Sequence, residues 1–262
     1  MSRWTRVLSS FGIMGVACVT YLWLFGTQTF LVVEAHNISR KLPFVNRTPV
    51  ELTDLSISRA PGMTLSYFGY EFDVPWTDID EAKTKIIGGN KVIIFFRSGN
   101  VLSVWSGPPH EFMNGFFELG KIDRDTFQKV YGDEALQSDY DFKRLILETT
   151  PDKITLLSSK KTAVSQSVLL TVKALSVPGD PNSGIFAVQG RKFKGFQYGC
   201  PQSPPKHLSA ELFPEDGHLD LLFGQYGPTV ISQADINRIV QTIHKAPVEA
   251  AGKDASVGKD LP

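Results

Sequence analysis

One group of residues in the sequence could act as a nucleophilic site, and it lies around the second cysteine. Cys200 stands in the Pro-rich segment YGCPQSPPKH, His207 closes that segment, and His218 and Asp220 follow in the next apolar run. A histidine within hydrogen-bond reach of a cysteine can accept its proton and leave a reactive thiolate. Since the segment matches no catalytic motif, an ordinary thiol at the end of a strand is the simpler interpretation of Cys200.

A second group is acidic and could offer oxygen ligands to calcium. Asp78, Asp80 and Glu81 stand close together in VPWTDIDEAK, but the segment lacks the glycine and the final acid of an EF-hand loop. Thr77 or Asp78 as the N-cap of a helix that runs to Lys85 explains the same residues. We therefore expect a helix cap here and no metal.

Other chemical motifs are missing from the sequence. His110-Glu111 has no second histidine four residues on, and His36, His207, His218 and His244 show no ligand spacing. There is no P-loop, no G-x-G-x-x-G and no G-x-S-x-G. We accordingly predict no catalytic, cofactor-binding or metal-ligating residue, and the sequence leans against an enzyme.

The composition limits the function classes. Lys+Arg and Asp+Glu balance at 27 each in 262 residues, so there is no basic excess for binding nucleic acid. The hydrophobic content of 42% and the 18 phenylalanines are enough for a folded core. Only Cys18 and Cys200 are present, which argues against a disulfide framework or a cysteine-based zinc site.

The N-terminus carries an uncharged run of 27 residues, Val7 to Val33, behind Arg3 and Arg6. A helix of that length reaches about 40 Å, more than the roughly 30 Å hydrocarbon core, and much longer than the apolar part of a signal peptide. It predicts an uncut transmembrane signal-anchor embedded in the lipid bilayer, with the span proper at Leu8 to Phe25. Cleavage before His36 and lipidation at Cys18 are the alternatives.

The layout of the chain predicts its orientation. Basic residues flank both ends of the run, so the positive-inside rule alone does not decide. A short tail, residues 1–6, before one span and one large domain is the usual signal-anchor arrangement. We expect a single-pass protein of the cell membrane with an extracytoplasmic C-terminal domain, periplasmic in a Gram-negative cell.

Three pairs of β-rich runs make up much of the expected globular domain, residues 63–244. They are KVIIFFRSGNVLSVWS, GIFAVQGRKFKGFQYG and HLSAELFPEDGHLDLLF. Lys91 to Arg97 is apolar on both faces, which predicts a central strand, and Gly195 interrupts the alternation as a β-bulge would. One strand is expected to place three alternating aromatic residues in the core: Phe68, Tyr70 and Phe72.

Helical periodicity lies between and after these pairs, at residues 139–150, at 162–175 and at the C-terminal end. The second of these segments has its apolar stripe at Val164, Val168, Val172 and Leu175. In the last, Ser232 is an N-cap with Asp235 three residues on.

Together these patterns predict an α+β fold. We expect a mostly antiparallel sheet of about six to seven strands with a central helical insertion and a C-terminal helix, preceded by one N-terminal transmembrane helix. We expect residues 34–62 to form a juxtamembrane linker and residues 245–262 to form a disordered tail.

The segments YFGYEFDVPW, KVIIFFRSG, GFQYG and INRIVQTIH carry a resemblance over most of residues 65–244. The chain resembles uncharacterised bacterial membrane-anchored or exported proteins of unknown function, and its order of hairpins before a terminal helix is distantly similar to PsbP-like domains. The resemblance implies an extracytoplasmic binding or assembly module with an unknown protein or small-molecule partner. The alternative function is a membrane-tethered thiol enzyme or hydrolase that uses Cys200 with His207 or His218.

Overall fold

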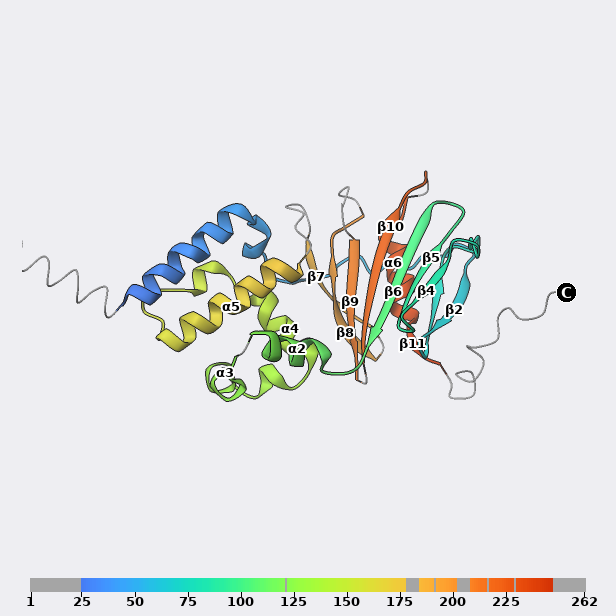
Figure 1. Ribbon diagram of the computed structural model, residues 1–262. Coiled ribbons are helices and arrows are strands. Elements are labelled where there is room, and N and C mark those ends of the chain that lie inside the picture. Colours follow the sequence, from blue (N-terminus) through green and yellow to red (C-terminus); the bar gives the residue numbers. More distant parts are fainter. Residues whose placement is uncertain are drawn as a thin grey trace, which may run out of the picture.

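The computed structural model describes residues 25–120, 122–177, 184–190, 192–201, 208–215, 217–228 and 230–246. These residues form three layers: a group of helices, a large central sheet, and a small sheet with one helix on the far side (Figure 1). The fold class is α+β, as the sequence predicts.

The central sheet has eight strands among the described residues, more than predicted. All neighbours are antiparallel except β1 and β7, which run parallel. The two outermost strands have two and three residues, too few for an alternating pattern to be recognised in the sequence. The order across the sheet is β1 (Val50–Glu51), β7 (Ile185–Gln189), β8 (Phe193–Tyr198), β9 (Leu208–Pro214), β10 (His218–Gln225), β6 (Asn100–Gly107), β5 (Lys91–Phe95) and β4 (Lys85–Ile87).

A small sheet of three strands, in the order β11 (His244–Lys245), β3 (Tyr70–Val74) and β2 (Met63–Tyr67), lies on the far side. Phe68 and Gly69 form the β2–β3 turn with φ of 56° and 76°, the positive values of a tight two-residue hairpin. Tyr70 and Phe72 are buried in the core as predicted. The strand prediction for Phe68 is wrong, because that residue makes the turn and lies in neither strand, although it is partly buried against the core.

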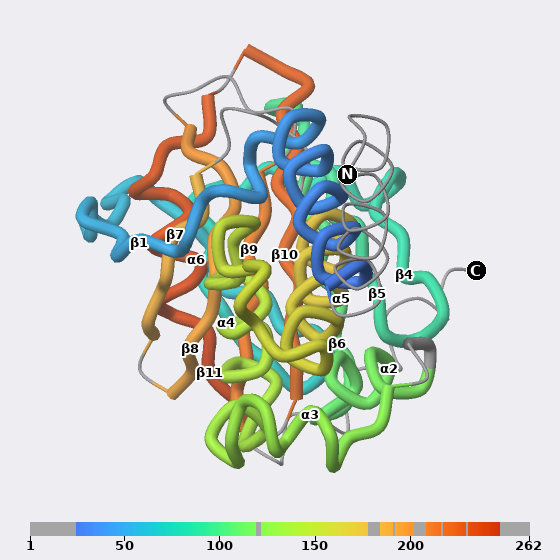
Figure 2. Tube along the Cα trace, turned by 90° about the vertical axis from the view of Figure 1, so that its left-hand side faces the viewer, coloured from blue at the N-terminus to red at the C-terminus, as the bar shows by residue number. Residues whose placement is uncertain are grey.

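The helical layer is inserted between β6 and β7, as predicted. It contains α2 (Glu111–Gly120), α3 (Arg124–Tyr131), α4 (Asp139–Glu148) and α5 (Lys160–Ser176), with short 3-10 helices at Glu134–Leu136 (η2) and Pro151–Lys153 (η3). A further helix over residues 25–41 lies in the same layer (Figures 1 and 2). On the opposite side of the sheet, α6 (Gln233–Thr242) begins with the predicted capping box of Ser232 and Asp235.

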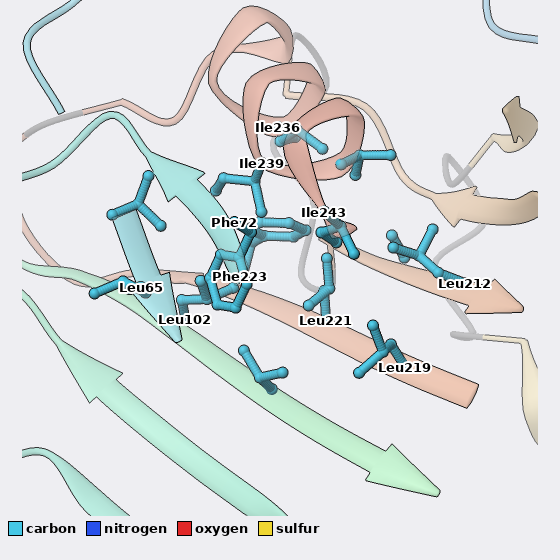
Figure 3. Close-up of a cluster of buried hydrophobic side chains, with 14 of the residues drawn as sticks. Leu65, Phe72, Leu102, Leu212, Leu219, Leu221, Phe223, Ile236, Ile239 and Ile243 are labelled. Carbon is cyan, nitrogen blue, oxygen red and sulfur yellow. The ribbon is translucent and has the colours of Figure 1, made fainter. Parts of the chain in front are cut away.

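The main core fills the space between the central sheet and the layer of α6 and the small sheet (Figure 3). Leu212, Leu219 and Leu221 come from the sheet, and Ile236 and Ile239 come from α6, each nearly inaccessible to solvent. The alternation of these leucines along β9 and β10 puts them all on one face. The opposite faces of the same strands therefore turn toward the helices.

The helical layer has its own core of aromatic residues. Phe116, Phe127 and Phe142, from three different helices, are buried, and the Phe116 and Phe142 ring centroids lie 4.8 Å apart in an edge-to-face arrangement. A further cluster joins the 25–41 helix to α5 and to the sheet through Leu170 and Phe196. The layer is thus fixed to the sheet by apolar packing.

The expected juxtamembrane linker, residues 34–62, is instead packed into the domain. The 3-10 helix Pro43–Asn46 (η1) buries Phe44 and Val45 completely, and β1 pairs with β7. The following stretch runs along α6, where the Asn237 side-chain amide donates to the carbonyls of Asp54 and Ser56 at 2.7 and 2.8 Å. The boundary at residue 63 was wrong because mixed polar composition hid these backbone contacts.

The predicted transmembrane segment falls mainly outside the described residues, which begin at residue 25. Its last part, residues 25–33, belongs to the 25–41 helix, where Leu31 and Val32 pack against the domain. Among the described helices, none combines the length and the apolar character that crossing a bilayer requires.

Two local strand predictions are wrong. Gly195 forms no bulge, because the pairing of β8 with both β7 and β9 continues through it without interruption. The strand at Lys91–Phe95 is second from the edge rather than central. Its Val92 and Ile94 are buried in the main core, but Ile93 and Phe95 on the other face are half-buried.

One local helix prediction is wrong, and another is confirmed only in part. No helix follows Asp78, whose Oδ2 instead accepts the Ser98 N–H at 2.6 Å and holds the β5–β6 turn. In α5 only the middle of the predicted stripe is buried: Val168 and Val172 pack against the helical core, whereas Val164 is 43% and Leu175 82% exposed. This helix packs on two sides, against α3 and α4 and against the 25–41 helix, so its burial follows no single stripe.

Candidate functional site

The structure does not bring Cys200 and His218 together. Cys200 follows the end of β8, where Tyr198 pairs with Ser209, whereas His218 begins β10 beside the Leu219–Leu212 pair. Ser209 and Leu212 are three residues, or about 10 Å, apart on β9. Cys200 lies beyond the first pair and His218 beyond the second, in opposite directions along the sheet, so more than about 15 Å separates the two side chains. His207 lies outside the described residues.

The acidic segment after Trp76 does not form a metal site in the described structure. Asp80 pairs with Lys83, with 3.0 Å between Oδ2 and Nζ, and Asp78 is used by the turn at Ser98. The described residues contain no group of three potential ligands with metal-binding geometry.

A groove of about 710 Å³ lies at one end of the central sheet, between the helical layer and β11. Six segments line it among the described residues: Tyr70 of β3, Pro109 and His110 before α2, the start of α4 at residues 138–141, the β7–β8 turn at residues 189, 190 and 192–194, the β9–β10 turn at residues 213–215 and 217, and the α6–β11 junction at residues 243–245. Residues far apart in the sequence thus meet here because the ends of antiparallel strands alternate along the sheet edge.

The groove has a basic side and aromatic walls. Lys192, Lys194 and Lys245 line it and are exposed. The Lys194 ammonium lies 5.4 Å from the ring centroid of Tyr140, and the Lys245 ammonium lies 6.0 Å from that of Tyr70. Cation–π contacts of this kind orient the lysine side chains over the aromatic rings.

Asp139 gives the groove a buried acid. Its side chain is only 5% exposed, and Oδ1 accepts the Met113 N–H at 3.1 Å, which satisfies an amide in the first turn of α2. Its other oxygen, Oδ2, is buried and has no hydrogen-bond partner among the described residues. A buried carboxylate oxygen without a donor is costly, and Asp139 is one of the residues that line the groove.

A polar cluster lies beneath the groove, on the sheet face that meets α4. Lys143 is 1% exposed, and its Nζ lies 3.0 and 2.9 Å from Oε1 and Oε2 of Glu211. The Tyr198 hydroxyl donates to Glu211 Oε2 at 2.7 Å. The Lys143 ammonium also lies 4.6 Å from the ring centroid of Phe112. The ion pair is therefore enclosed by aromatic rings.

His218 and Asp220 belong to the same cluster. The His218 ring stacks on Phe213 at 5.2 Å, and Phe213 also lines the groove. The Nε2 atom of His218 lies 2.9 Å from Asp220 Oδ1. This distance is short enough for an ion pair, although the angle between the two groups does not suit a hydrogen bond. Burial lowers the pKa of His218, but the carboxylates of Asp220 and Glu211 outweigh it and raise the pKa above 6.5. Protonated His218 balances the charges, because the cluster then holds two acids and two bases.

Sequence reasoning named His218 and Asp220 with the wrong partner and missed Asp139, Lys143 and Glu211. A signal for Lys143 exists: it stands among Phe142, Ile146 and Leu147 on the face of α4 that turns inward. A lysine on an apolar stripe needs a buried counter-charge. Nothing local in the sequence shows that this counter-charge is Glu211.

No protein-family model matches the chain, and no curated protein or solved structure is significantly similar to it.

Proposed function

We propose that the protein is a membrane-anchored binding module whose ligand site is the groove at the end of the central sheet. The observation that carries this proposal is the buried Asp139 Oδ2, which lacks a donor in the wall of a large groove. Ligand sites are typically concave, partly apolar, and equipped with a few convergent polar groups. The groove has the size and the composition of such a site.

The lining supports a particular ligand chemistry. The lining contains three lysines and three acids, Asp139, Asp141 and Glu215. The lysines favour a carboxylate or another acidic group, and the acids favour hydroxyl or amide donors on the same molecule. Tyr140, which is half-buried in the groove wall, offers a ring against which a ring or a carbon chain can pack. We therefore propose a small organic acid that also carries hydroxyl groups, such as an acidic sugar.

The ligand proposal is tested by thermal unfolding of the detergent-solubilised full chain with galacturonate and gluconate as probes. A ligand at about 100 times its Kd adds about 2.7 kcal/mol to stability, which raises the Tm measurably. We expect the increase to disappear in Asp139→Asn, which keeps an acceptor for Met113 but turns the other position into a donor. It should persist in Lys85→Gln, whose lysine lies on β4 outside the groove.

Two results would contradict the proposed ligand site. One is an equal Tm increase in Asp139→Asn and Lys85→Gln, which would place binding elsewhere. The other is the absence of any Tm increase, combined with no added mass on the native protein purified from its own membranes.

The membrane location rests on the uncharged run Val7 to Val33 and is tested separately. We propose that the span lies within residues 7–25 and that the domain is extracytoplasmic. The intact mass of the protein in carbonate-washed membranes should be that of the full chain. A soluble chain starting near His36 would contradict an anchor, and an acylated chain starting at Cys18 would indicate a lipoprotein.

A further inference from the structure

A tight turn before α5 presents two leucines to solvent. The Ser158 N–H donates to the Thr155 carbonyl at 3.2 Å, which closes a four-residue turn with Leu156 and Leu157 at its two central positions. Leu156 is 40% exposed and Leu157 95% exposed. A turn that fixes two large apolar side chains outward is unusual on a surface that meets only water.

Positive charge adjoins this turn. Lys160 and Lys161 are the first two residues of α5, both exposed, and neither forms an ion pair with a described residue. The first turn of α5 contains no acidic residue. Lysines at a helix N-terminus add to the positive end of the helix dipole instead of opposing it. Two exposed leucines beside two lysines form a surface that matches a bilayer interface, where apolar lipid chains lie next to anionic headgroups.

The chain enters the domain at the same end of the molecule. Ile154, just before the turn, is buried in the cluster against which Leu31 and Val32 of the 25–41 helix pack. The start of that helix and the start of α5 lie together at the left end of Figure 1. The 18 residues immediately before Phe25, from Val7 to Leu24, carry no charge. As a helix they would measure about 27 Å, close to the thickness of a hydrocarbon core.

We propose that the turn Thr155–Ser158 and the first turn of α5 dock on an anionic phospholipid bilayer. Leu157 enters the interfacial region, and Lys160 and Lys161 contact lipid phosphates. This inference rests on the proposed anchor, because a span ending near Phe25 brings the bilayer surface to this end of the domain. The anchor alone does not require the contact, so the two can be tested apart.

The test measures depth at two exposed leucines, one in the turn before α5 and one near the end of α5. Leu157→Cys and Leu175→Cys are made in a full chain that also carries Cys18→Ser and Cys200→Ser, and each is spin-labelled in nanodiscs. Leu175 is 82% exposed and lies about 25 Å further along α5, which makes it the matched control. Collision with oxygen and with a water-soluble nickel chelate reports whether each label lies in lipid or in water.

In nanodiscs containing phosphatidylglycerol we expect the label at 157 to be accessible to oxygen and shielded from nickel, and the label at 175 to be accessible to nickel. Lys160→Glu with Lys161→Glu, or pure phosphatidylcholine, should expose 157 to nickel. A 157 label as wet as 175, in a chain retained by the nanodisc, overturns the docking and leaves the anchor intact. Shielding that is insensitive to charge overturns the role of the lysines. A chain that does not remain with the nanodisc overturns the anchor and the docking together.

Discussion

Two buried lysines in the helical layer show how differently the same side chain is used. Lys173 of α5 is fully buried, and its Nζ donates to the carbonyls of Arg47, Leu147 and Thr149 at 2.6, 2.6 and 2.8 Å. Lys143 of α4 is equally buried but pairs with a carboxylate beside the groove. The first lysine joins three backbone segments, whereas the second belongs to a charged cluster.

The surroundings of the two lysines differ in how they affect the charge of buried groups. Burial of Lys173 among neutral carbonyls lowers its pKa from 10.5 to about 8. In the Lys143 cluster, by contrast, the acids Glu211 and Asp220 are only partly shielded, and they surround a histidine that can change its charge. We expect the two regions to differ in how strongly they respond to mutation and to respond oppositely to pH.

The largest effect is expected for Lys173→Met. Loss of the ammonium leaves three carbonyls without this donor, including those at the end of α4, and should reduce the free energy of unfolding by about 3 to 5 kcal/mol. The measurement is denaturant unfolding of the full chain in detergent. Lys161→Met on the exposed start of the same helix is the control and should change stability by less than about 0.5 kcal/mol. Equal effects of the two variants would refute the proposed clamp.

A smaller effect is expected when the ion pair of the groove cluster is broken. A double-mutant cycle of Lys143→Met and Glu211→Gln should give a coupling energy of about 1 to 3 kcal/mol, because the pair is close but Glu211 retains some contact with water. The comparison predicts that Lys143→Met also weakens any probe binding in the groove, whereas Lys173→Met does not. Coupling near zero would mean that Lys143 is held by packing alone.

The pH dependence should have opposite signs in the two regions. Because the folded pKa of His218 lies above 6.5, its stabilising contribution is complete below pH 6.5 and is lost as pH rises through the folded pKa. Because the folded pKa of Lys173 is about 8, the contribution of Lys173 makes the fold more stable as pH rises from about 8 to 10.5. Unfolding free energies across this range should lose the first slope in Asp220→Asn and the second in Lys173→Met. Unchanged slopes in these variants would assign the titrations to other groups.

The smallest effect is expected for Tyr198→Phe. It removes only the hydroxyl that donates to Glu211 Oε2, which still accepts from Lys143, so stability should fall by about 1 kcal/mol. Chemical denaturation of this variant alone and combined with Lys143→Met shows whether the two donors support each other. A loss as large as that of Lys173→Met would remove the distinction between the regions.

Features set by local sequence were predictable. The capping box of Ser232 and Asp235, and the hairpins that became β5–β6, β7–β8 and β9–β10, depend on residues only a few positions apart. Strands as short as β1 and β11 have no pattern of their own and exist because a neighbouring strand lies beside them. Their pairing was therefore invisible in the sequence.

The candidate site was less predictable than the fold because its parts meet only through tertiary structure. Lys143 and Glu211 are 68 residues apart, and Asp139 caps a helix that begins 28 positions earlier. His218 and Asp220 alternate with buried leucines, which in the sequence looks the same as a strand with one wet face. Only the helical layer placed over that face turns their charges into a cluster.

The path of residues 34–62 bears on how the groove could find its ligand. A free linker would let the domain search a wide volume around its attachment, with an effective concentration set by linker length. Here β1 is paired with β7, and the next stretch is hydrogen-bonded along α6. If residues 7–24 cross the bilayer, little slack remains between lipid and domain. The distance of the groove from the membrane and its orientation would then stay nearly constant. The groove would meet only ligands at that distance from the membrane, instead of sampling the whole volume that a free linker allows.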